Sequence, residues 1–318
     1  MKIDPIYEKW IDSLDLTKSR IVRFPSLIFL CGGPTSEDSK GYKSCRDIFY
    51  KSIKNSPSCP FKDNLVLAEE IFRYFQHSSY KDLISFETDL AELSLLTVVF
   101  SESPGSIAEF GSFAVIKEIR ERLLVVMHEE DANKESFVWR GPALFLKETA
   151  KAKNIKDPIS IYNWQREQPE EGSFSVDAFS DVEDLSETIE SIINNTPKSL
   201  AFNNSDPGHV MLLILDLLKM LNLATIEEIT DILKHLGIDT NRQKIEQYIS
   251  LLISLKYAVQ KDYGHYTFYL SAPHKPWFSF TFKKGSLNND MERWRFYFID
   301  QYSTQQIKKH RALKAYMK

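Results

Sequence analysis

Short apolar runs alternate along residues 26–162 with segments whose apolar positions recur every three or four residues. Runs such as Ser26–Cys31 and Leu95–Phe100 are uninterrupted and too short for helices, which is typical of strands buried on both faces of a sheet. The segment Asp82–Leu93 instead gathers its large apolar side chains on one face of a helix. The same reasoning predicts further strands at Asn64–Leu67, Leu123–Met127 and Ile159–Tyr162, and helices at Ser44–Ile53, Ala68–Phe75, Ser106–Glu121, Gly141–Lys153 and Asp184–Asn194.

Strands that alternate with helices predict a parallel sheet with helices on both faces. We therefore expect residues 1–198 to form one α/β domain with a flavodoxin-like layout, in which residues 1–24 are a short helical lead-in. The first predicted strand stops at Gly32 and Gly33, because a Gly-Gly-Pro sequence cannot continue a strand. The composition changes around Asn203–Gly208, so the first domain is expected to end close to that segment.

Residues 199–275 are expected to form a smaller α+β domain. Val210–Leu221 is an apolar helix, and the capping-box patterns that begin at Thr225 and Thr240 predict the starts of two more helices. A hairpin is expected over Tyr257–Leu270, where two strand-like runs flank a turn that contains glycine. Three helices followed by a hairpin look like a winged helix.

The usual inference from a winged helix is DNA binding, but the charge of this domain is nearly balanced. Asp206–Lys275 holds seven Lys/Arg and eight Asp/Glu, and the third helix offers Arg242 and Lys244 near its start. A domain that reads DNA normally has a basic face. Contact with a protein and contact with a nucleic acid therefore both remain open.

Residues 276–318 form a basic, aromatic-rich tail. Nine Lys/Arg stand against three acidic residues between Lys283 and Lys318, which suits either a solvated helix or contact with a polyanion. Eight aromatic residues gather here and are expected either to pack on the second domain or to form a subunit or partner interface: Trp277, Phe278, Phe280, Phe282, Trp294, Phe296, Tyr297 and Phe298.

The composition narrows the class of protein further. The 318 residues are 43% hydrophobic and 26% charged with a net charge of −4, as in an ordinary globular protein. The first residues lack a signal-peptide pattern and no apolar run reaches the length of a membrane span, so we expect a cytoplasmic protein without membrane contact. Three cysteines without a CxxC pair and seven scattered histidines argue against disulfides and metal sites.

The segment Leu95–Phe113 is the strongest candidate for a functional site. It predicts a buried strand, a polar turn that contains Pro104 and Gly105, and a helix with Glu109 in its first turn. Ligands of α/β proteins bind at the carboxyl ends of strands, where the amides of helix N-termini are free. The amides of the turn from Ser103 to Ser106 could therefore hold a 5′-phosphate.

A purely structural interpretation of Glu109 competes with the functional one. Ser106 and Glu109 match the S-x-x-E pattern, in which Ser106 would cap the helix and Glu109 would bind back to its amide. Other residues favour a site. Glu102 lies in the same loop, and Gly32 and Gly33 would allow a ligand to approach the backbone at the same edge.

The residue types suit cleavage of a glycosidic bond in a nucleoside or nucleotide. That reaction passes through an oxocarbenium-like state, which needs a carboxylate at C1′ as nucleophile or as charge stabiliser. Glu109 and Glu102 are the candidate catalytic carboxylates. Cys31, at the strand end, is expected to be a packed thiol that lines the site and not a nucleophile.

Two motifs together resemble a known family. The sequence IFLCGG over Ile28–Gly33 and the sequence ESPGS-x-x-E-x-G over Glu102–Gly111 resemble the nucleoside 2-deoxyribosyltransferase family, whose catalytic Glu is followed by an aliphatic residue and Gly. Phe110 occupies the aliphatic position here. The pair looks closer still to the nucleoside deoxyribosyltransferase-like effectors of bacterial retron anti-phage systems, which also carry a winged-helix-like domain.

This resemblance implies a toxin that hydrolyses the N-glycosidic bond of NAD⁺ or a related nucleotide. NAD⁺ would be the substrate, and no cofactor is implied. Glu109 would be the catalytic carboxylate with Glu102 in the site, Glu87 and Glu92 match acidic positions on the preceding helix, and Arg46 could meet a phosphate. The implied partners are a reverse transcriptase and its RNA–DNA product (msDNA). Separately, the aromatic cluster of the tail leads us to expect an oligomer or filament.

Three alternatives remain open at this stage. One is a transferase or hydrolase that acts on free deoxyribonucleosides. The second is a regulator without enzymatic activity, in which the α/β domain senses a nucleotide and the winged helix binds DNA. The third is a purely structural subunit of a filament, for which the aromatic cluster of the tail would supply an interface.

Overall fold

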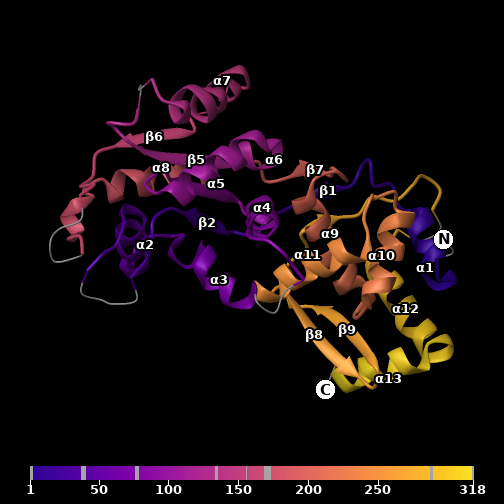
Figure 1. The fold of residues 1–318 in the computed structure, drawn as a ribbon. Coiled ribbons are helices and arrows are strands. Elements are labelled where there is room, and N and C mark those ends of the chain that lie inside the picture. Colours follow the sequence, from indigo (N-terminus) through magenta and orange to yellow (C-terminus); the bar gives the residue numbers. More distant parts are fainter. Residues whose placement is uncertain are drawn as a thin grey trace. The chain divides into compact units, whose positions relative to one another are not determined.

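The computed structural model describes residues 3–36, 41–75, 79–132, 135–154, 156–167, 173–286 and 289–316 (Figure 1). The chain divides into two compact units. The sheet unit consists of residues 25–72 and 90–196, and the helical unit consists of residues 1–24, 73–89 and 197–318. The division near residue 197 is close to the expected boundary, but the expected domain limits stay a prediction.

The sheet unit is built on five parallel strands, which confirms the expected mixed α/β class. They are β2 (Ile28–Cys31), β3 (Leu65–Leu67), β4 (Leu96–Phe100), β5 (Leu123–His128) and β6 (Ile159–Tyr162), in the spatial order β3-β2-β4-β5-β6. Counted along the chain, this order is 2-1-3-4-5, so the direction of winding reverses between β2 and β4. All residues of β2, β4 and β5 are buried, which explains their uninterrupted apolar sequences.

Helices cover the two faces of this sheet. On one face, α2 (Cys45–Asn55) and α8 (Val182–Asn195) pack over a core that includes Leu30, Phe49 and Leu185. On the other face, α5 (Pro104–Val115) places Phe113 against Phe29, with the ring centroids 6.4 Å apart. The unit also contains α6 (Lys117–Arg120), a π-helical turn at Trp139–Ala143, α7 (Leu144–Ala152), and single turns at Lys62–Asn64 and Val176–Ala178.

Two helices, α3 (Ala68–Phe75) and α4 (Leu83–Leu93), are divided between the sheet unit and the helical unit. The helix α3 lies where the sequence predicted it. The boundary between the units falls within each of these helices.

The predicted helix over Ser106–Glu121 is wrong in its limits. The structure has α5 from Pro104 and a separate α6 from Lys117, because Ile116 adopts extended backbone angles (φ −83°, ψ 118°) between them. The start is earlier than predicted because Ser103, and not Ser106, is the N-cap residue.

The helical unit contains helices from both ends of the chain. The helix α1 (Pro5–Ser13) and the strand β1 (Arg20–Ile21) belong here and not to the sheet unit, where the sequence placed residues 1–24. The strand β1 pairs antiparallel with β7 (Leu200–Ala201) and with β10 (Phe278–Ser279). The expected helical lead-in is therefore part of the second compact unit.

The centre of the helical unit is α9 (Pro207–Leu221), which is almost entirely buried. It is followed by α10 (Ile226–His235), α11 (Arg242–Ser254) and the antiparallel hairpin of β8 (Ala258–Tyr263) and β9 (Tyr266–Ser271). The capping box predicted at Thr225 is confirmed. The one predicted at Thr240 is wrong, because the side chain of Asn241 caps α11.

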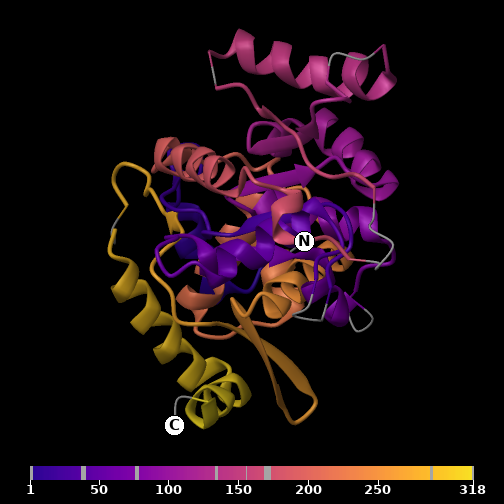
Figure 2. The same cartoon turned by 90° about the vertical axis from the view of Figure 1, so that its left-hand side faces the viewer.

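The tail forms two helices, α12 (Met291–Gln305) and α13 (Ile307–Tyr316), which follow one another in yellow in Figure 2. Trp294 and Phe298 are buried on α12, and Trp10 of α1 packs edge-on against Phe298 at 5.6 Å. Phe296 remains 69% exposed. Much of the aromatic cluster therefore packs in the core of the helical unit. Among the described residues, no helix is both long and apolar enough to cross a membrane.

Candidate functional site

The loops that follow β2 and β4 meet at one edge of the parallel sheet. The two strands are neighbours, and Cys31 at the end of β2 is in register with Val99 near the end of β4. Gly32 and Gly33 follow β2, and Ser101–Ser103 lead from β4 into α5. This edge lies at the point where the strand order reverses, which is the usual ligand-binding place of an open α/β sheet.

Glu109 is not part of a helix cap. The capping box of α5 joins Ser103 and Ser106: the amide of Ser106 donates to Ser103 Oγ at 3.1 Å, and the amide of Ser103 donates to Ser106 Oγ at 3.0 Å. Glu109 lies in the second turn, so the structural interpretation in which it binds back to Ser106 is wrong. The prediction of a carboxylate in the first turn is wrong for the same reason.

The Glu109 carboxylate is half-buried and incompletely paired. The Cys31 thiol donates a hydrogen bond to it, while Oε2 is buried and has no hydrogen-bond partner among the described residues. Burial raises the pKa of Glu109, and the Cys31 hydrogen bond and the positive charge of Arg46 oppose that rise. A buried carboxylate oxygen without a partner is unusual in a folded protein and marks a place where a ligand could bind.

Glu102 has a different environment. Its Oε1 accepts hydrogen bonds from the amides of Gly33 (2.8 Å) and Arg46 (3.1 Å), and its Oε2 accepts one from the amide of Cys45 (2.7 Å). Burial raises the pKa of Glu102, and these three amides oppose the rise. The carboxylate thus occupies the amino end of α2, where an anion is favoured, and ties the glycine loop to that helix.

Arg46 is buried, and both terminal nitrogens of its guanidinium are bound by the protein, whereas its Nε has no hydrogen-bond partner among the described residues. Its guanidinium donates to the carbonyl oxygens of Leu30 (3.2 Å) and Gly33, and it pairs with both carboxylate oxygens of Glu69. The predicted contact of Arg46 with a phosphate would require these bonds to be exchanged. Sequence reasoning missed Glu69, although its place in the first turn after β3 at the same edge of the sheet was a signal.

The two glycines are required by close packing. A Cβ atom on Gly32 would lie 2.8 Å from Arg46 Cβ, and one on Gly33 would lie 2.6 Å from Ser44 Cβ. Ser44 is the N-cap of α2, and its Oγ accepts from the amide of Asp47 at 3.0 Å. The glycines therefore let the first loop pass close to the start of α2, which brings Glu102 within reach of both.

A cavity of about 290 Å³ opens at this edge. Its lining includes the predicted residues Gly33, Glu102 and Ser103, but Glu109 and Arg46 are not among the residues that line it. The lining also includes side chains that sequence reasoning missed, namely Lys43, Trp164, Gln165, Arg166 and Phe174. Trp164 and its neighbours follow β6 at the carboxyl edge of the sheet, and that position was an available signal.

Of the remaining predicted site residues, Pro104 and Gly105 lie at the start of α5, whereas Glu92 and Glu87 lie elsewhere. Pro104 and Gly105 are exposed in the first turn of α5, and Gly105 is the residue of that turn whose amide is left for a ligand, since Pro104 has no N–H. Glu92 is buried near the amino end of β4, where Arg122 donates to its carbonyl oxygen at 2.9 Å, so the structure does not bring it to Glu109. Glu87 belongs to the helical unit.

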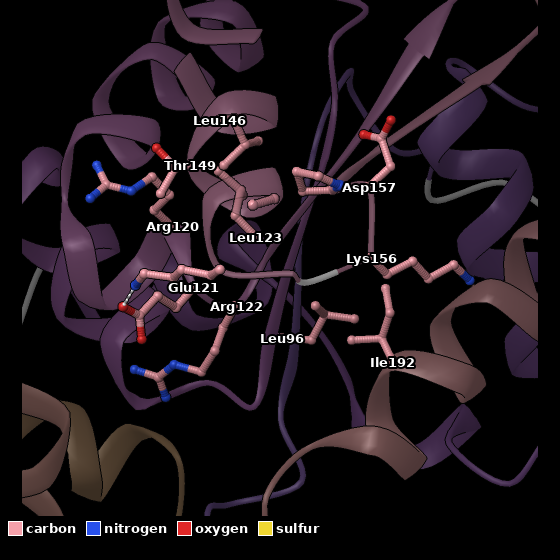
Figure 3. Close-up of a pocket in the computed structure, with 13 residues that line it drawn as sticks. Leu96, Arg120, Glu121, Arg122, Leu123, Leu146, Thr149, Lys156, Asp157 and Ile192 are labelled. Atoms are coloured by element: carbon pink, nitrogen blue, oxygen red, sulfur yellow. Dashed lines mark hydrogen bonds and ion pairs between the residues drawn. The ribbon is translucent and has the colours of Figure 1, made fainter. Parts of the chain in front are cut away.

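A second cavity of the sheet unit, of about 70 Å³, lies at the opposite edge (Figure 3). Leu96 and Leu123, the first residues of β4 and β5, line it (Figure 3). Glu121 and Lys153, which form an ion pair, also line it. It is far too small for a nucleotide and lies at the amino ends of the strands, so it is not a candidate for the site.

The two cations that the sequence singled out on α11 are paired within the helical unit. Arg242 forms ion pairs with Glu227 and Glu246, the latter at 2.7 Å. Lys244 lies 2.9 Å from both carboxylate oxygens of the buried Asp89. The third helix therefore offers little free positive charge to DNA.

The fold and this edge define a mixed α/β protein with an acidic site where the strand order reverses. A family model described as "STM3845 retron effector protein" matches residues 42–260, more than two thirds of the chain, and the chain belongs to that family. The matched segment includes Arg46, Glu102 and Glu109 and begins after the glycine loop.

Two proteins of Escherichia coli are similar to part of the chain. The retron Ec73 "putative ribosyltransferase/DNA-binding protein" is 30% identical over 120 residues, and the retron Ec86 protein of the same description is 32% identical over 141 residues. These alignments span 36% and 42%, respectively, of this chain and the same shares of the two relatives.

Proposed function

We propose that this retron effector is an anti-phage toxin that hydrolyses the N-glycosidic bond of NAD⁺ or a related nucleotide, with Glu109 as the catalytic carboxylate. The observation that carries the proposal is the state of Glu109 itself. It lies outside the helix cap, and one of its oxygens is buried with no hydrogen-bond partner in the described part of the chain, at the edge where an α/β sheet binds ligands. The relatives' description as ribosyltransferases supports chemistry at C1′ of a ribose.

The reaction balances with this chain's residues and water. The Glu109 carboxylate attacks C1′ as the C1′–N bond breaks, nicotinamide leaves as a neutral base with the bond's electron pair, and a ribosyl ester forms. Water then adds at C1′, which gives ADP-ribose and a proton and restores the carboxylate. Cys31 would hold Glu109 in orientation, and the Gly105 amide at the start of α5 would face a phosphate.

Glu102 and Arg46 would act as positioning residues in this scheme. Glu102 holds the amides of the glycine loop and of α2, while Arg46 holds the carbonyl oxygens of Leu30 and Gly33 on either side of Cys31. The geometry thus favours a supporting role for Glu102 over the catalytic one that the sequence suggested. The proposed roles of Glu87 and Glu92 stay predictions.

A sugar transferase that uses a nucleoside and an acceptor base is the second candidate. The relatives' description as ribosyltransferases favours transfer over hydrolysis. The cavity of about 290 Å³ beside Glu102 offers Trp164 and Gln165 to the ring of an acceptor base. We also propose that the sheet is flavodoxin-like, as its 2-1-3-4-5 order suggests, and that α9–α11 with the hairpin form a winged helix.

The proposed partners are a reverse transcriptase and its RNA–DNA product, which would restrain the toxin until infection. Membership in a retron effector family and the relatives' description as DNA-binding support this part of the proposal. An oligomer or filament stays a prediction.

The test is to incubate the purified protein with NAD⁺, NADP⁺, nucleosides and deoxynucleosides, and to identify the products by chromatography and mass spectrometry. We expect a free base or nicotinamide that disappears with Glu109→Gln. Glu129→Gln is the matched control, because Glu129 is an exposed carboxylate after β5 at the same edge of the sheet. Equal release by wild type and Glu109→Gln would overturn the role of Glu109. No release with any substrate, despite nucleotide binding, would favour a sensor.

A further inference from the structure

The helical unit carries a row of three exposed cations on α13. Lys308, Arg311 and Lys314 are exposed on one side of α13, and the opposite side of that helix buries Ala312 and Leu313. Among the described residues, no carboxylate lies within ion-pair distance of these three cations. This contrasts with α11, whose Arg242 and Lys244 are paired. The helix α13 therefore carries exposed positive charge without an ion pair among the described residues, which the two cations of α11 do not.

The hairpin β8–β9 packs beside this row. Tyr316 of α13 donates a hydrogen bond to the carbonyl oxygen of Asp262 at 2.7 Å, and its ring meets that of Tyr263 at 6.5 Å. Lys308 lies over the ring of Tyr266, 5.3 Å from its centroid. The cations of α13 and the aromatic side chains of the hairpin thus form one continuous surface.

A hollow of about 510 Å³ opens between the hairpin and the start of α13. Tyr266 and Phe268 form one wall, with rings stacked at 6.1 Å and 20° between their planes, and Tyr266 is 44% exposed. Gln305, Gln306 and Lys308 line the hollow from the α12–α13 junction. An aromatic wall with amide groups opposite is the chemistry that binds a nucleobase, by stacking on its face and hydrogen bonding to its edge.

The polar groups of the hollow leave an acceptor for such a base. Gln306 Nε2 donates to Asp4 at 2.7 Å, but Gln306 Oε1 is buried and has no partner among the described residues. The carboxylate of Glu228 also lines the hollow, and its oxygens already accept from Lys309 (2.7 Å) and from the amide of Thr225 (2.9 Å). The amino group of a base could therefore pair with Gln306, and Glu228 is neutralised.

We propose that α13 and the β8–β9 hairpin bind single-stranded nucleic acid, with one unstacked base in the hollow and its phosphates along Lys308, Arg311 and Lys314. This inference rests on the proposed function, in which the protein binds an RNA–DNA product. It adds which surface binds the nucleic acid and that the bound part is single-stranded. A single strand fits because its bases are free to leave the stack, whereas the bases of a duplex are paired. The groove between α11 and the hairpin, of about 550 Å³, holds the paired Arg242 and is not the phosphate-binding face.

Binding is measured by fluorescence anisotropy with a labelled 20-nucleotide mixed-sequence DNA strand, and with its duplex, over a range of salt concentrations. We expect the full-length protein to bind the single strand more tightly than the duplex. The triple variant Lys308→Gln, Arg311→Gln and Lys314→Gln should bind more weakly and lower the slope of log K against log[salt] by about 2, at about 0.7 per phosphate contact.

Variants of Tyr266 distinguish the contribution of base stacking to binding from that of positive charge. Tyr266→Leu should weaken binding of the single strand by at least about fivefold, and Tyr266→Phe, which keeps the ring, should restore it. Arg242→Gln is the control on the α11 face and should bind as wild type does. Circular dichroism and thermal unfolding confirm that each variant is folded.

Three outcomes would overturn the inference: no binding of the strand by the wild type at low salt, an unchanged triple variant, or duplex binding that depends on Arg242. The binding assay does not depend on catalysis, so it tests this surface even if the protein hydrolyses none of the nucleotides. Conversely, loss of binding in these variants with base release intact would leave the role of Glu109 standing.

Discussion

Glu109 combines features that a structural residue rarely has together. One oxygen of its carboxylate is buried and finds no hydrogen-bond partner among the residues that the structure describes. The Cys31 thiol donates to the group, and the charges of Arg46 and Glu69 shift its pKa in opposite directions. Burial of an unpaired carboxylate destabilises the folded state, since the charged form loses its hydration. A residue that destabilises the fold and is not needed for a helix cap is best explained by a function.

The first prediction follows from the cost of burying the charged Glu109 carboxylate. Because the pKa of Glu109 is raised in the folded state, this group does not oppose folding below its unfolded pKa; its cost grows as the pH rises through its folded pKa and is complete above it. Glu109→Gln should therefore raise the free energy of unfolding at pH 7 by roughly 1 kcal/mol. The gain over wild type should shrink as the pH falls through the pKa of Glu109.

Urea unfolding between pH 4 and pH 8 measures this difference. Glu129→Gln, which removes an exposed carboxylate from the same edge of the sheet, should change stability little at either end of the range. If Glu109→Gln destabilised the protein at pH 7, the carboxylate would have to make a stabilising contact that the structure does not contain.

At the scale of the helix and strand, local sequence placed most elements within two or three residues. The strands β2, β4, β5 and β6 and the helices α2 and α3 lie where their apolar patterns predicted them. Helix starts were harder, because several Ser, Thr and Asn residues compete for each cap. The N-cap of α5 is Ser103 and not Ser106, and the N-cap of α11 is Asn241 and not Thr240.

The competition at α11 gives a second prediction. Asn241 Oδ1 accepts from the amide of Lys244 at 2.9 Å, so Asn241→Ala should lower the free energy of unfolding by about 1 kcal/mol. Thr240 Oγ1 is buried without a hydrogen-bond partner among the described residues, so Thr240→Ala should cost almost nothing. Thermal unfolding of the two single variants gives the comparison, and an equal loss in both would mean that Thr240 shares the cap.

At the scale of the whole molecule, side chains from both ends of the chain meet inside the helical unit. Lys309 of α13 is 5% exposed and donates to Glu228 of α10 at 2.7 Å and to the hydroxyl of Tyr7 of α1 at 2.8 Å. Its ammonium also lies 4.4 Å from the ring centroid of Tyr302. These contacts join α13 to α1 and α10, which are distant in the sequence, and to the neighbouring α12.

The third prediction tests that junction. Lys309→Met should destabilise the protein by about 3 kcal/mol, because it leaves the charge of Glu228 without its partner in a mostly buried position. Lys308→Met, one residue earlier and exposed, should change stability by no more than about 0.5 kcal/mol. Urea unfolding followed by tryptophan fluorescence compares them. Equal stability of the two variants would show that the Lys309 contacts add nothing to the fold.

The sequence by itself determined the α/β class, the order of strands and helices in the sheet unit, and the candidate residues Glu109, Glu102, Gly32 and Gly33. These depend on periodicity and on short motifs, which are local properties of the chain. Only the tertiary structure decided that Glu102 holds the start of α2, that Glu69 pairs with Arg46, and that residues 1–24 pack with the tail. Those outcomes depend on contacts between residues that are far apart in the sequence. The local pattern of hydrophobic and polar residues does not specify which of these residues come into contact.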